Sequence, residues 1–254
     1  MKLIKIFSIL MSMSLIFVSC SKDDDKDSNE TSAGAQKKLK SIDYNHPGYI
    51  LSFIYTNGKI SRDVASYYDS FYGETRYYNK NITYLDSKIE TQSDGETITY
   101  NLTNGLVTRI IDGEDYEDIT YENGRIKTRK KYYNGELGED ILFEWKDDVI
   151  VHEKITYGEG GDYYYTYTDY IDYGGIVASF QDDSFLYDDL PESLILQGYF
   201  GKLPKYLVSE INDVEPDGIG KTNFSYVMDE DRYPTTMTCI LNDGRSFYTY
   251  YTWE

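Results

Sequence analysis

Apolar and polar residues alternate with a period of two over most of the chain after residue 36. Ile141, Phe143 and Trp145 share one face of an extended segment, and Tyr163, Tyr165, Tyr167, Ile171 and Tyr173 share one face of another. Such alternation is typical of strands that bury one face and leave the other in water. The pattern therefore predicts an all-β domain.

Turn dipeptides separate these segments at regular intervals. Between Gly95 and Gly135, Asn-Gly and Asp-Gly pairs recur every 8 to 11 residues. These residue types supply the positive φ that tight hairpin turns require. Regular spacing of this kind predicts a long antiparallel meander, in which each strand pairs with the next along the chain.

Residues 188–211 break the alternation. Their apolar spacing predicts a short helix from about Leu190 to Phe200, with Asp188 or Asp189 as its N-cap and Pro191 in its first turn. We expect this helix to cover the core face or to plug the mouth of a curled sheet.

The first 19 residues have the layout of a secretory signal: two lysines, then an apolar or small run from Ile6 to Val18. At ~1.5 Å per residue this run is too short for a ~30 Å hydrocarbon core, so we interpret it as a cleaved signal peptide. Residues 17–20, Phe-Val-Ser-Cys, resemble the bacterial lipobox. That resemblance implies that Cys20 carries fatty acyl chains such as palmitate and anchors the protein to a bilayer. The alternative is an ordinary secretory signal cleaved elsewhere.

Residues 20–36 are polar and charged, and we expect them to form a disordered acidic tether ahead of a single domain at residues 37–254. Lys22, Asp23 and Asp24 resemble the surface-export signal of Bacteroidota lipoproteins. The resemblance implies an outer-membrane protein that faces the cell exterior; retention in the periplasm is the rival hypothesis.

The chain is strongly acidic, with a formal net charge of −19. Removing residues 1–19 takes away two lysines and no acids, so 23 bases and 44 acids leave −21. This charge argues against nucleic-acid binding. Because Cys20 is expected to be acylated, Cys239 has no partner for a disulfide, and we interpret it as a small buried hydrophobe.

Residues with catalytic or metal-binding potential are few. His46 and His152 have no metal-ligand spacing, and no nucleotide-binding or nucleophile motif is present, so we predict no metal, no cofactor and no defined catalytic residues. Glu144 and Glu153 would be the first carboxylates to examine for glycan hydrolysis. Residues 213–218 resemble the start of a calcium loop, but Phe224 stands where the closing Glu belongs, which favours an ordinary acidic turn.

The 29 tyrosines allow two interpretations. Packing within a twisted sheet is the simpler, because a tyrosine ring suits a half-buried strand. Alternatively, exposed aromatics could stack on sugar rings or hold an amphiphile. The candidates for such stacking are Trp145, Tyr163, Tyr165 and Tyr167.

Two segments carry a family resemblance: the C-terminal FSYVMDEDRYPTTMTCILNDGRSFYTYYTWE and the GYFGKLPKYLVSEI stretch that begins at Gly198. Together with the YxNGxI units at Tyr55–Ile60 and Tyr121–Ile126, they resemble a Bacteroidota lipoprotein family, a domain of unknown function with a porin-like fold. The resemblance implies a meander curled into a half-barrel or barrel-like sheet, and it implies no activity.

Three functions remain open from the sequence. The first is a surface-displayed module that binds a glycan or a small amphiphile. The second is a structural component of the cell envelope that binds another envelope protein. The third, a glycan hydrolase, has the least support.

Overall fold

The computed structural model describes residues 37–45, 48–158, 162–171, 190–204, 206–215 and 218–254. They belong to one compact unit, Lys37–Glu254, and residues 1–36 form a separate unit. The strands are β1 (Leu39–Asp43), β2 (Ile50–Thr56), β3 (Lys59–Asp69), β4 (Glu74–Tyr84), β5 (Lys88–Ser93), β6 (Glu96–Thr103), β7 (Leu106–Asp112), β8 (Asp115–Glu122), β9 (Arg125–Tyr133), β10 (Glu136–Lys146), β11 (Val149–Tyr157), β12 (Asp162–Ile171), β13 (Leu207–Glu215), β14 (Gly218–Met228), β15 (Pro234–Ile240) and β16 (Ser246–Trp253).

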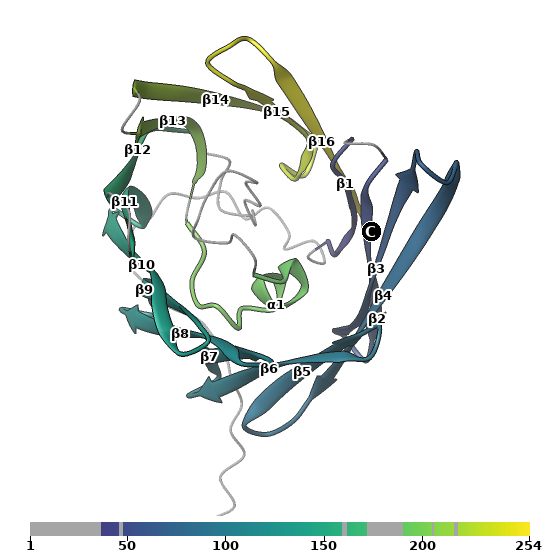
Figure 1. Cartoon of the computed structure of the whole chain (residues 1–254). Coiled ribbons are helices and arrows are strands. Elements are labelled where there is room, and N and C mark those ends of the chain that lie inside the picture. Colours follow the sequence, from purple (N-terminus) through teal and green to yellow (C-terminus); the bar gives the residue numbers. More distant parts are fainter. Residues whose placement is uncertain (1–36, 46–47, 159–161, 172–189, 205, 216–217) are drawn as a thin grey trace, which may run out of the picture. The chain divides into compact units, whose positions relative to one another are not determined.

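These strands form a closed antiparallel barrel (Figure 1). Each strand pairs with its neighbours along the chain, and the last strand pairs with the first, from Leu39 opposite Trp253 to Asp43 opposite Tyr250. The prediction of an all-β meander is confirmed. Of the two expected shapes, the sheet adopts the closed one, which leaves no free edge between β16 and β1.

The tight turns use the residues that the sequence indicated. Asn57, Asn104 and Asn123 each have φ between 52° and 55°, and the glycine that follows each of them is also in the left-handed region. At these three turns the strand register shifts immediately before the turn, next to Tyr55, Leu102 and Tyr121. The same hairpin geometry therefore recurs around one end of the barrel.

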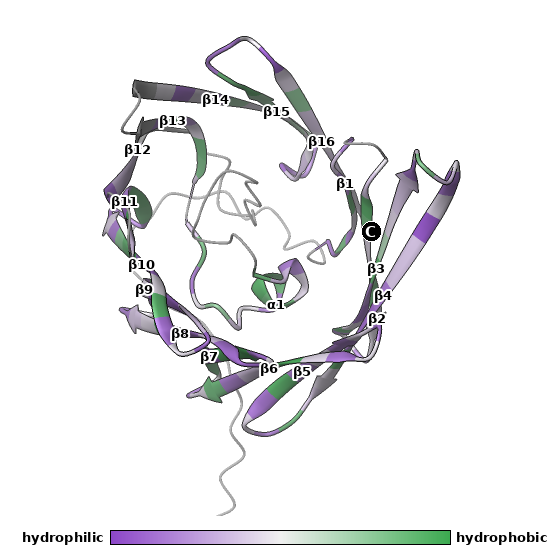
Figure 2. Ribbon diagram, in the orientation of Figure 1, coloured by the Kyte–Doolittle hydropathy of each residue, from purple (hydrophilic) through white to green (hydrophobic). Residues whose placement is uncertain are grey.

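The apolar face of the sheet points into the barrel, and helix α1 (Glu192–Leu196) lies within the ring of strands (Figures 1 and 2). Leu194, Ile195 and Phe200 are buried against the inward-facing strand residues. One short helix near residues 190–200 was predicted, and it is present. Pro191 occupies its N-cap without a side-chain cap hydrogen bond, and Asp188 and Asp189 lie outside the described residues.

The segment after α1 follows the barrel wall closely. The Lys202 backbone N–H donates to the Gly124 carbonyl at 2.8 Å, and the Val107 N–H donates to the Tyr199 carbonyl at 2.9 Å. Gly201 has φ +84°, and a Cβ there would lie 2.4 Å from the Gly124 oxygen. Only glycine fits this approach, which fixes the α1 segment across the β8–β9 turn.

The two ends of the barrel differ. Because a meander alternates its connections between the ends, the β12–β13 connection that contains α1 shares an end with the β2–β3 turn and with the entry of the chain into β1. We call this the α1 end. The β3–β4 connection lies at the opposite, distal end.

The outward face of β7–β12 carries ion pairs between neighbouring strands. Arg109 donates two hydrogen bonds to Asp118, at 2.6 and 2.8 Å. Lys130 contacts Asp140, and Lys154 contacts Asp162, each at 2.7 Å. Among the described residues, no helix is long and apolar enough to cross a membrane.

Candidate functional site

The aromatics predicted to stack on a ligand lie among the core residues. Trp145 and Tyr163 are half-buried and pack against the apolar cluster, and so does Tyr165. The Trp145 indole N–H donates to the Ile126 carbonyl at 2.8 Å. The Tyr167 backbone pairs with Ile211 in the β12–β13 ladder, while its side chain lies outside the described residues. A role for these four in ligand binding stays a prediction.

Trp145 belongs to a repeated arrangement at the α1 end. Near the end of an even-numbered strand, an aromatic side chain packs on the core and donates a hydrogen bond to a carbonyl near the start of the preceding strand. The donor–acceptor pairs, with the aromatic residue first, are Tyr55–Leu39, Tyr84–Ile60, Tyr121–Val107, Trp145–Ile126, Tyr226–Val208 and Trp253–Pro234, at 2.6–3.1 Å. We call the six aromatic residues the aromatic collar.

The collar satisfies backbone groups next to the turns. A carbonyl that faces the core near a turn needs a partner, and the tyrosine hydroxyl or indole N–H supplies one. Burial raises the pKa of Tyr55 and of Tyr84 to about 12, so both hydroxyls keep their protons at neutral pH and remain donors. Four of the 29 tyrosines therefore have a structural role in the collar, and the YxNGxI units of the sequence supply two of them.

Charged side chains also lie inside the barrel. Arg129 is fully buried on β9 and donates to both carboxylate oxygens of Glu117 on β8, at 2.5 and 3.1 Å. Lys131 contacts Glu139 at 3.2 Å. Burying a charge is costly unless it is paired, and these pairs span neighbouring strands. Their geometry suits a role in fixing strand register more than one in catalysis.

The two glutamates considered for hydrolysis lie on opposite faces of the sheet. Glu153 is buried and sits opposite Phe143 on the inward face, whereas Glu144 is exposed and sits opposite His152 on the outward face. Side chains of adjacent register positions point to opposite faces, so these two carboxylates cannot act together on one glycosidic bond.

Helix α1 is held to the wall by polar contacts. Ser193 donates to Asp63 on β3 at 2.8 Å, and Tyr44 donates to Glu192 at 2.9 Å. Asp63 is 4% exposed, and its second carboxylate oxygen is buried without a hydrogen-bond partner. Burial raises the pKa of Asp63 from 3.8 to about 6. The Asp63–Ser193 contact is therefore made by a group that titrates close to neutral pH.

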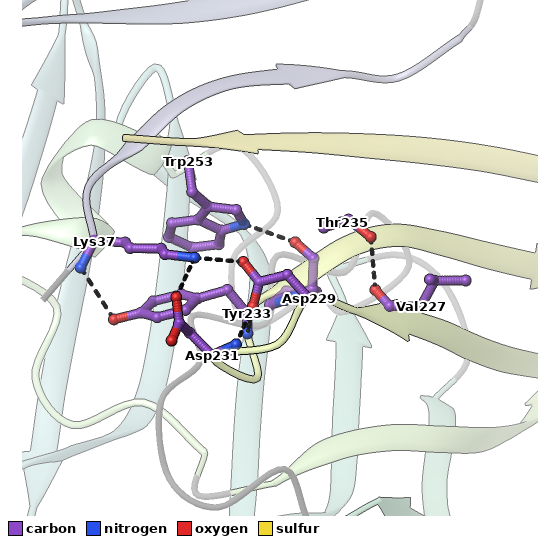
Figure 3. Close-up of polar contacts among 8 residues, drawn as sticks. Lys37, Val227, Asp229, Asp231, Tyr233, Thr235 and Trp253 are labelled. Atoms are coloured by element: carbon purple, nitrogen blue, oxygen red, sulfur yellow. Dashed lines mark hydrogen bonds and ion pairs between the residues drawn. The ribbon is translucent and has the colours of Figure 1, made fainter. Parts of the chain in front are cut away.

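The point where the chain enters the barrel is clamped by the β14–β15 turn (Figure 3). The Lys37 ammonium contacts Asp229 at 2.8 Å and Asp231 at 2.6 Å, and these hydrogen bonds raise its pKa. The Lys37 backbone N–H donates to the Tyr233 hydroxyl, and the Tyr233 ring packs on Trp253. The clamp fixes the chain at the α1 end.

At the distal end, β3 and β4 continue past their neighbours as a two-stranded ribbon (Figure 1). β4 pairs with β3 from Glu74 onward but pairs with β5 only from Asn81. The edge of β4 over residues 74–80 is thus not covered by β5. We call residues 67–80 the distal ribbon.

The distal ribbon exposes a group of aromatic rings. Phe71 is 86% exposed, Tyr77 is 67% and Tyr72 is 63%, and Tyr68 and Tyr78 are also exposed. Sequence reasoning missed this group. The available signal was the pair of Tyr-Tyr dipeptides at 67–68 and 77–78, because adjacent strand residues face opposite sides and cannot both be buried in one core.

Contacts within the ribbon hold these rings in place. Tyr67 and Tyr78 stack at 5.6 Å with 9° between their planes, and their hydroxyls are hydrogen bonded. Asp69 accepts from the backbone N–H groups of Phe71 and Tyr72, which fixes the turn. The Arg76 guanidinium lies 4.3 Å from the Tyr72 ring centre. The aromatic surface is therefore preorganised as well as exposed.

Several other sequence predictions can be placed. Cys239 is buried, as predicted. His152 is exposed, and its Nδ1 lies 3.2 Å from the Thr166 hydroxyl. Residues 213–215 end β13 and Gly218 begins β14, with the side chains of 213–215 outside the described residues, as are residues 216–217. His46, Cys20, Lys22, Asp23 and Asp24 also lie outside them. No group of His, Cys, Asp and Glu able to hold a metal occurs among the residues that the structure describes.

Comparison with solved structures finds the same architecture elsewhere. A porin-like protein from Bacteroides uniformis matches with a TM-score of 0.69 and 14% identity, over 85% of this chain and 96% of that one. In fold, this chain resembles the Bacteroides porin-like proteins. A second, from Bacteroides vulgatus, matches with a TM-score of 0.55 and 11% identity, over 85% and 98%. Neither a protein-family model nor a curated protein matches the sequence.

Proposed function

We propose that this chain is a lipid-anchored lipoprotein of the outer membrane, facing the cell exterior, and that its barrel is a module that binds a glycan or a small amphiphile. The observation that carries the binding role is the distal ribbon. Its rings are exposed at the end of the barrel opposite the point where the chain enters at Lys37. A site at that end would remain accessible in a protein tethered through residues 20–36.

The anchor is supported by the sequence. Cys20 follows a short apolar run with small residues before the cut, and Lys22, Asp23 and Asp24 come directly after it. Stable attachment needs more than one acyl chain, which a thioether-linked diacylglycerol supplies. The ion pairs on the outward face of β7–β12 are compatible with a barrel that stands in water beside the membrane.

The anchor is tested by metabolic labelling with a radioactive fatty acid. We expect the wild-type chain to take up label and Cys20→Ala to lose it. Cys239→Ala is the matched control because that thiol is buried in the barrel. Label that persists in Cys20→Ala would exclude the anchor.

Outward display is tested by treating intact cells with a protease. We expect the protein to be degraded without lysis, and replacement of Lys22, Asp23 and Asp24 by alanine to protect it. Full protection of the wild-type protein in intact cells, with degradation after lysis, would instead indicate the periplasm.

Ligand binding is tested by thermal shift with saccharides and with short-chain amphiphiles. We expect at least one of them to raise the melting temperature, since a ligand that binds only the folded state stabilises it. If none does, the binding role is wrong.

The uncovered edge of β4 favours one alternative, a role in binding an envelope protein, because an uncovered strand edge can pair with a strand of another chain. Crosslinking in cells that recovers only the monomer would argue against it.

A further inference from the structure

We propose that the distal ribbon is the ligand site of this protein and that it binds an uncharged glycan chain. This inference rests on the proposed binding function and deepens it by naming the site and the ligand class. It begins from the exposure of the rings: Phe71, Tyr72 and Tyr77 are each more than half exposed, on a ribbon whose turn is fixed by Asp69.

The rings occupy both faces of the ribbon. The register places Tyr67, Arg76 and Tyr78 on one face, and Tyr68 and Tyr77 on the other. On the first face, Tyr67 and Tyr78 stack on each other and Arg76 lies 4.3 Å from the Tyr72 ring centre, so these rings are held in place. On the second face, Tyr77 is 67% exposed, and the register places Thr75 and Asn79 on the same side. Flat, rigid rings with polar tips bury ligand surface at a small entropic cost, because they have few rotatable bonds.

The charge of the ribbon favours an uncharged ligand. Its ionisable residues at neutral pH are Asp69, Glu74, Arg76 and Lys80, two acids and two bases, in a chain of net charge −19. Arg76 lies 3.1 Å from Asp69 and 3.5 Å from Glu74, so its charge is compensated locally. An anionic polysaccharide would meet no net positive charge here and would be repelled by the rest of the barrel.

Polar groups next to the rings complete the match to a sugar. Thr75, Asn79 and the tyrosine hydroxyls can both donate and accept hydrogen bonds, as sugar hydroxyls require. A sugar ring presents C–H groups on its face and hydroxyls around its rim. The ribbon offers aromatic faces beside such polar groups, whereas a purely apolar partner would leave them unpaired.

The test uses the full chain with its N-terminal segment in place, purified in detergent. Binding is measured by isothermal titration calorimetry with four uncharged probes, maltohexaose, cellohexaose, mannohexaose and xylohexaose, and with the anionic hexagalacturonate. We expect at least one uncharged probe to bind and hexagalacturonate not to bind. Binding of hexagalacturonate alone, or of no probe, would overturn the inference.

The site is located with single variants. We expect Phe71→Ala, Tyr72→Ala and Tyr77→Ala each to weaken binding of the uncharged probe about tenfold or more, as central aromatic contacts do. Tyr248→Ala is the matched control, because Tyr248 is 42% exposed on β16 away from the ribbon. Circular dichroism confirms that each variant is folded, which is expected since the rings contribute little to the core.

The outcome also separates this inference from the proposed function. If the probe still binds the ribbon variants with wild-type affinity, the barrel binds glycans elsewhere: the binding function stands and the ribbon site is wrong. If an amphiphile stabilises the protein but no glycan binds, the function stands and the ligand class is wrong. If neither class binds, both fail.

Discussion

The two ends of this barrel use the same residue type in opposite ways. In the aromatic collar, Tyr55, Tyr84 and Tyr121 pack on the core, and each donates its hydroxyl proton to a backbone carbonyl. In the distal ribbon, Tyr72 and Tyr77 are mostly exposed, and the ring contacts are local to the hairpin. Tyrosine content alone therefore does not indicate a binding surface; the partner of each hydroxyl and the exposure of each ring do.

This difference has an energetic consequence. A collar residue contributes apolar burial and a hydrogen bond. Loss of that bond leaves a backbone carbonyl inside the barrel without a partner. A ribbon residue contributes little to folding, so its exposure is better explained by contact with a ligand. We therefore expect substitutions in the collar to lower the free energy of unfolding far more than substitutions in the ribbon.

The largest effect is expected from Trp145→Ala. The substitution removes a half-buried ring, its hydrogen bond to the Ile126 carbonyl and its contact with the Arg125 guanidinium at 5.4 Å. We expect the free energy of unfolding to fall by about 3–4 kcal/mol, as large-to-small core changes do. Urea denaturation measures it. A loss below about 1 kcal/mol would mean that the collar is not a stabilising element.

The second prediction concerns pH at the α1 end. The pKa of Asp63 is raised to about 6 from 3.8, so between these values the folded state binds a proton that the unfolded state releases. The free energy of unfolding therefore falls as pH rises from about 4 to about 6, by at most about 3 kcal/mol from this group. Above about pH 6 the free-energy cost of keeping the ionised Asp63 carboxylate buried no longer changes with pH.

The matching variant is Asp63→Asn, which can still accept the Ser193 hydrogen bond but cannot ionise. We expect it to gain stability relative to the wild-type protein as pH rises from 4 to 7, measured by urea denaturation across that range. If the free energy of unfolding of Asp63→Asn and of the wild-type protein changed with pH in parallel, Asp63 would not be a buried carboxyl with a raised pKa.

The barrel fold followed from local signals in the sequence. Alternation predicted the strands, and positive-φ turns such as Asn57 and Asn123 predicted the hairpins between them. Closure did not follow, because pairing between Leu39 and Trp253 depends on the accumulated twist and tilt of all the strands. The helix was placed correctly but is shorter than predicted, because the chain leaves the helix before Gly198, where φ is +78°.

The candidate site was harder to predict. Period-two patterning places Trp145, Tyr163 and Tyr165 on one face, but it does not say whether that face meets a ligand or the core. The structure packs these three against the core. The distal ribbon depends on a length difference between neighbouring strands. The Asp94-Gly95 turn marks the end of β5, but no residue type in β4 marks how far that strand extends beyond Asn81, where its pairing with β5 stops.

A smaller effect is expected from Tyr121→Phe, which keeps the collar ring and removes only its hydroxyl. The Val107 carbonyl then loses a hydrogen bond of 2.6 Å. We expect a loss of about 1–2 kcal/mol in the free energy of unfolding. Tyr77→Phe in the ribbon makes the same chemical change at an exposed ring and should leave stability unchanged. Equal effects at the two positions would remove the distinction between collar and ribbon.

The smallest effect on folding is expected from Phe71→Ala and Tyr77→Ala. Both rings lie on a ribbon whose turn is fixed by Asp69 and Gly73 rather than by the rings themselves, and neither ring belongs to the apolar cluster of the barrel. We expect the free energy of unfolding to change by less than about 0.5 kcal/mol in denaturant titrations, as for most surface substitutions. A loss above about 1 kcal/mol would show that the rings support the fold, and their exposure would then no longer argue for a ligand. Unchanged stability together with lost glycan affinity is a combination that a structural role for these rings does not produce.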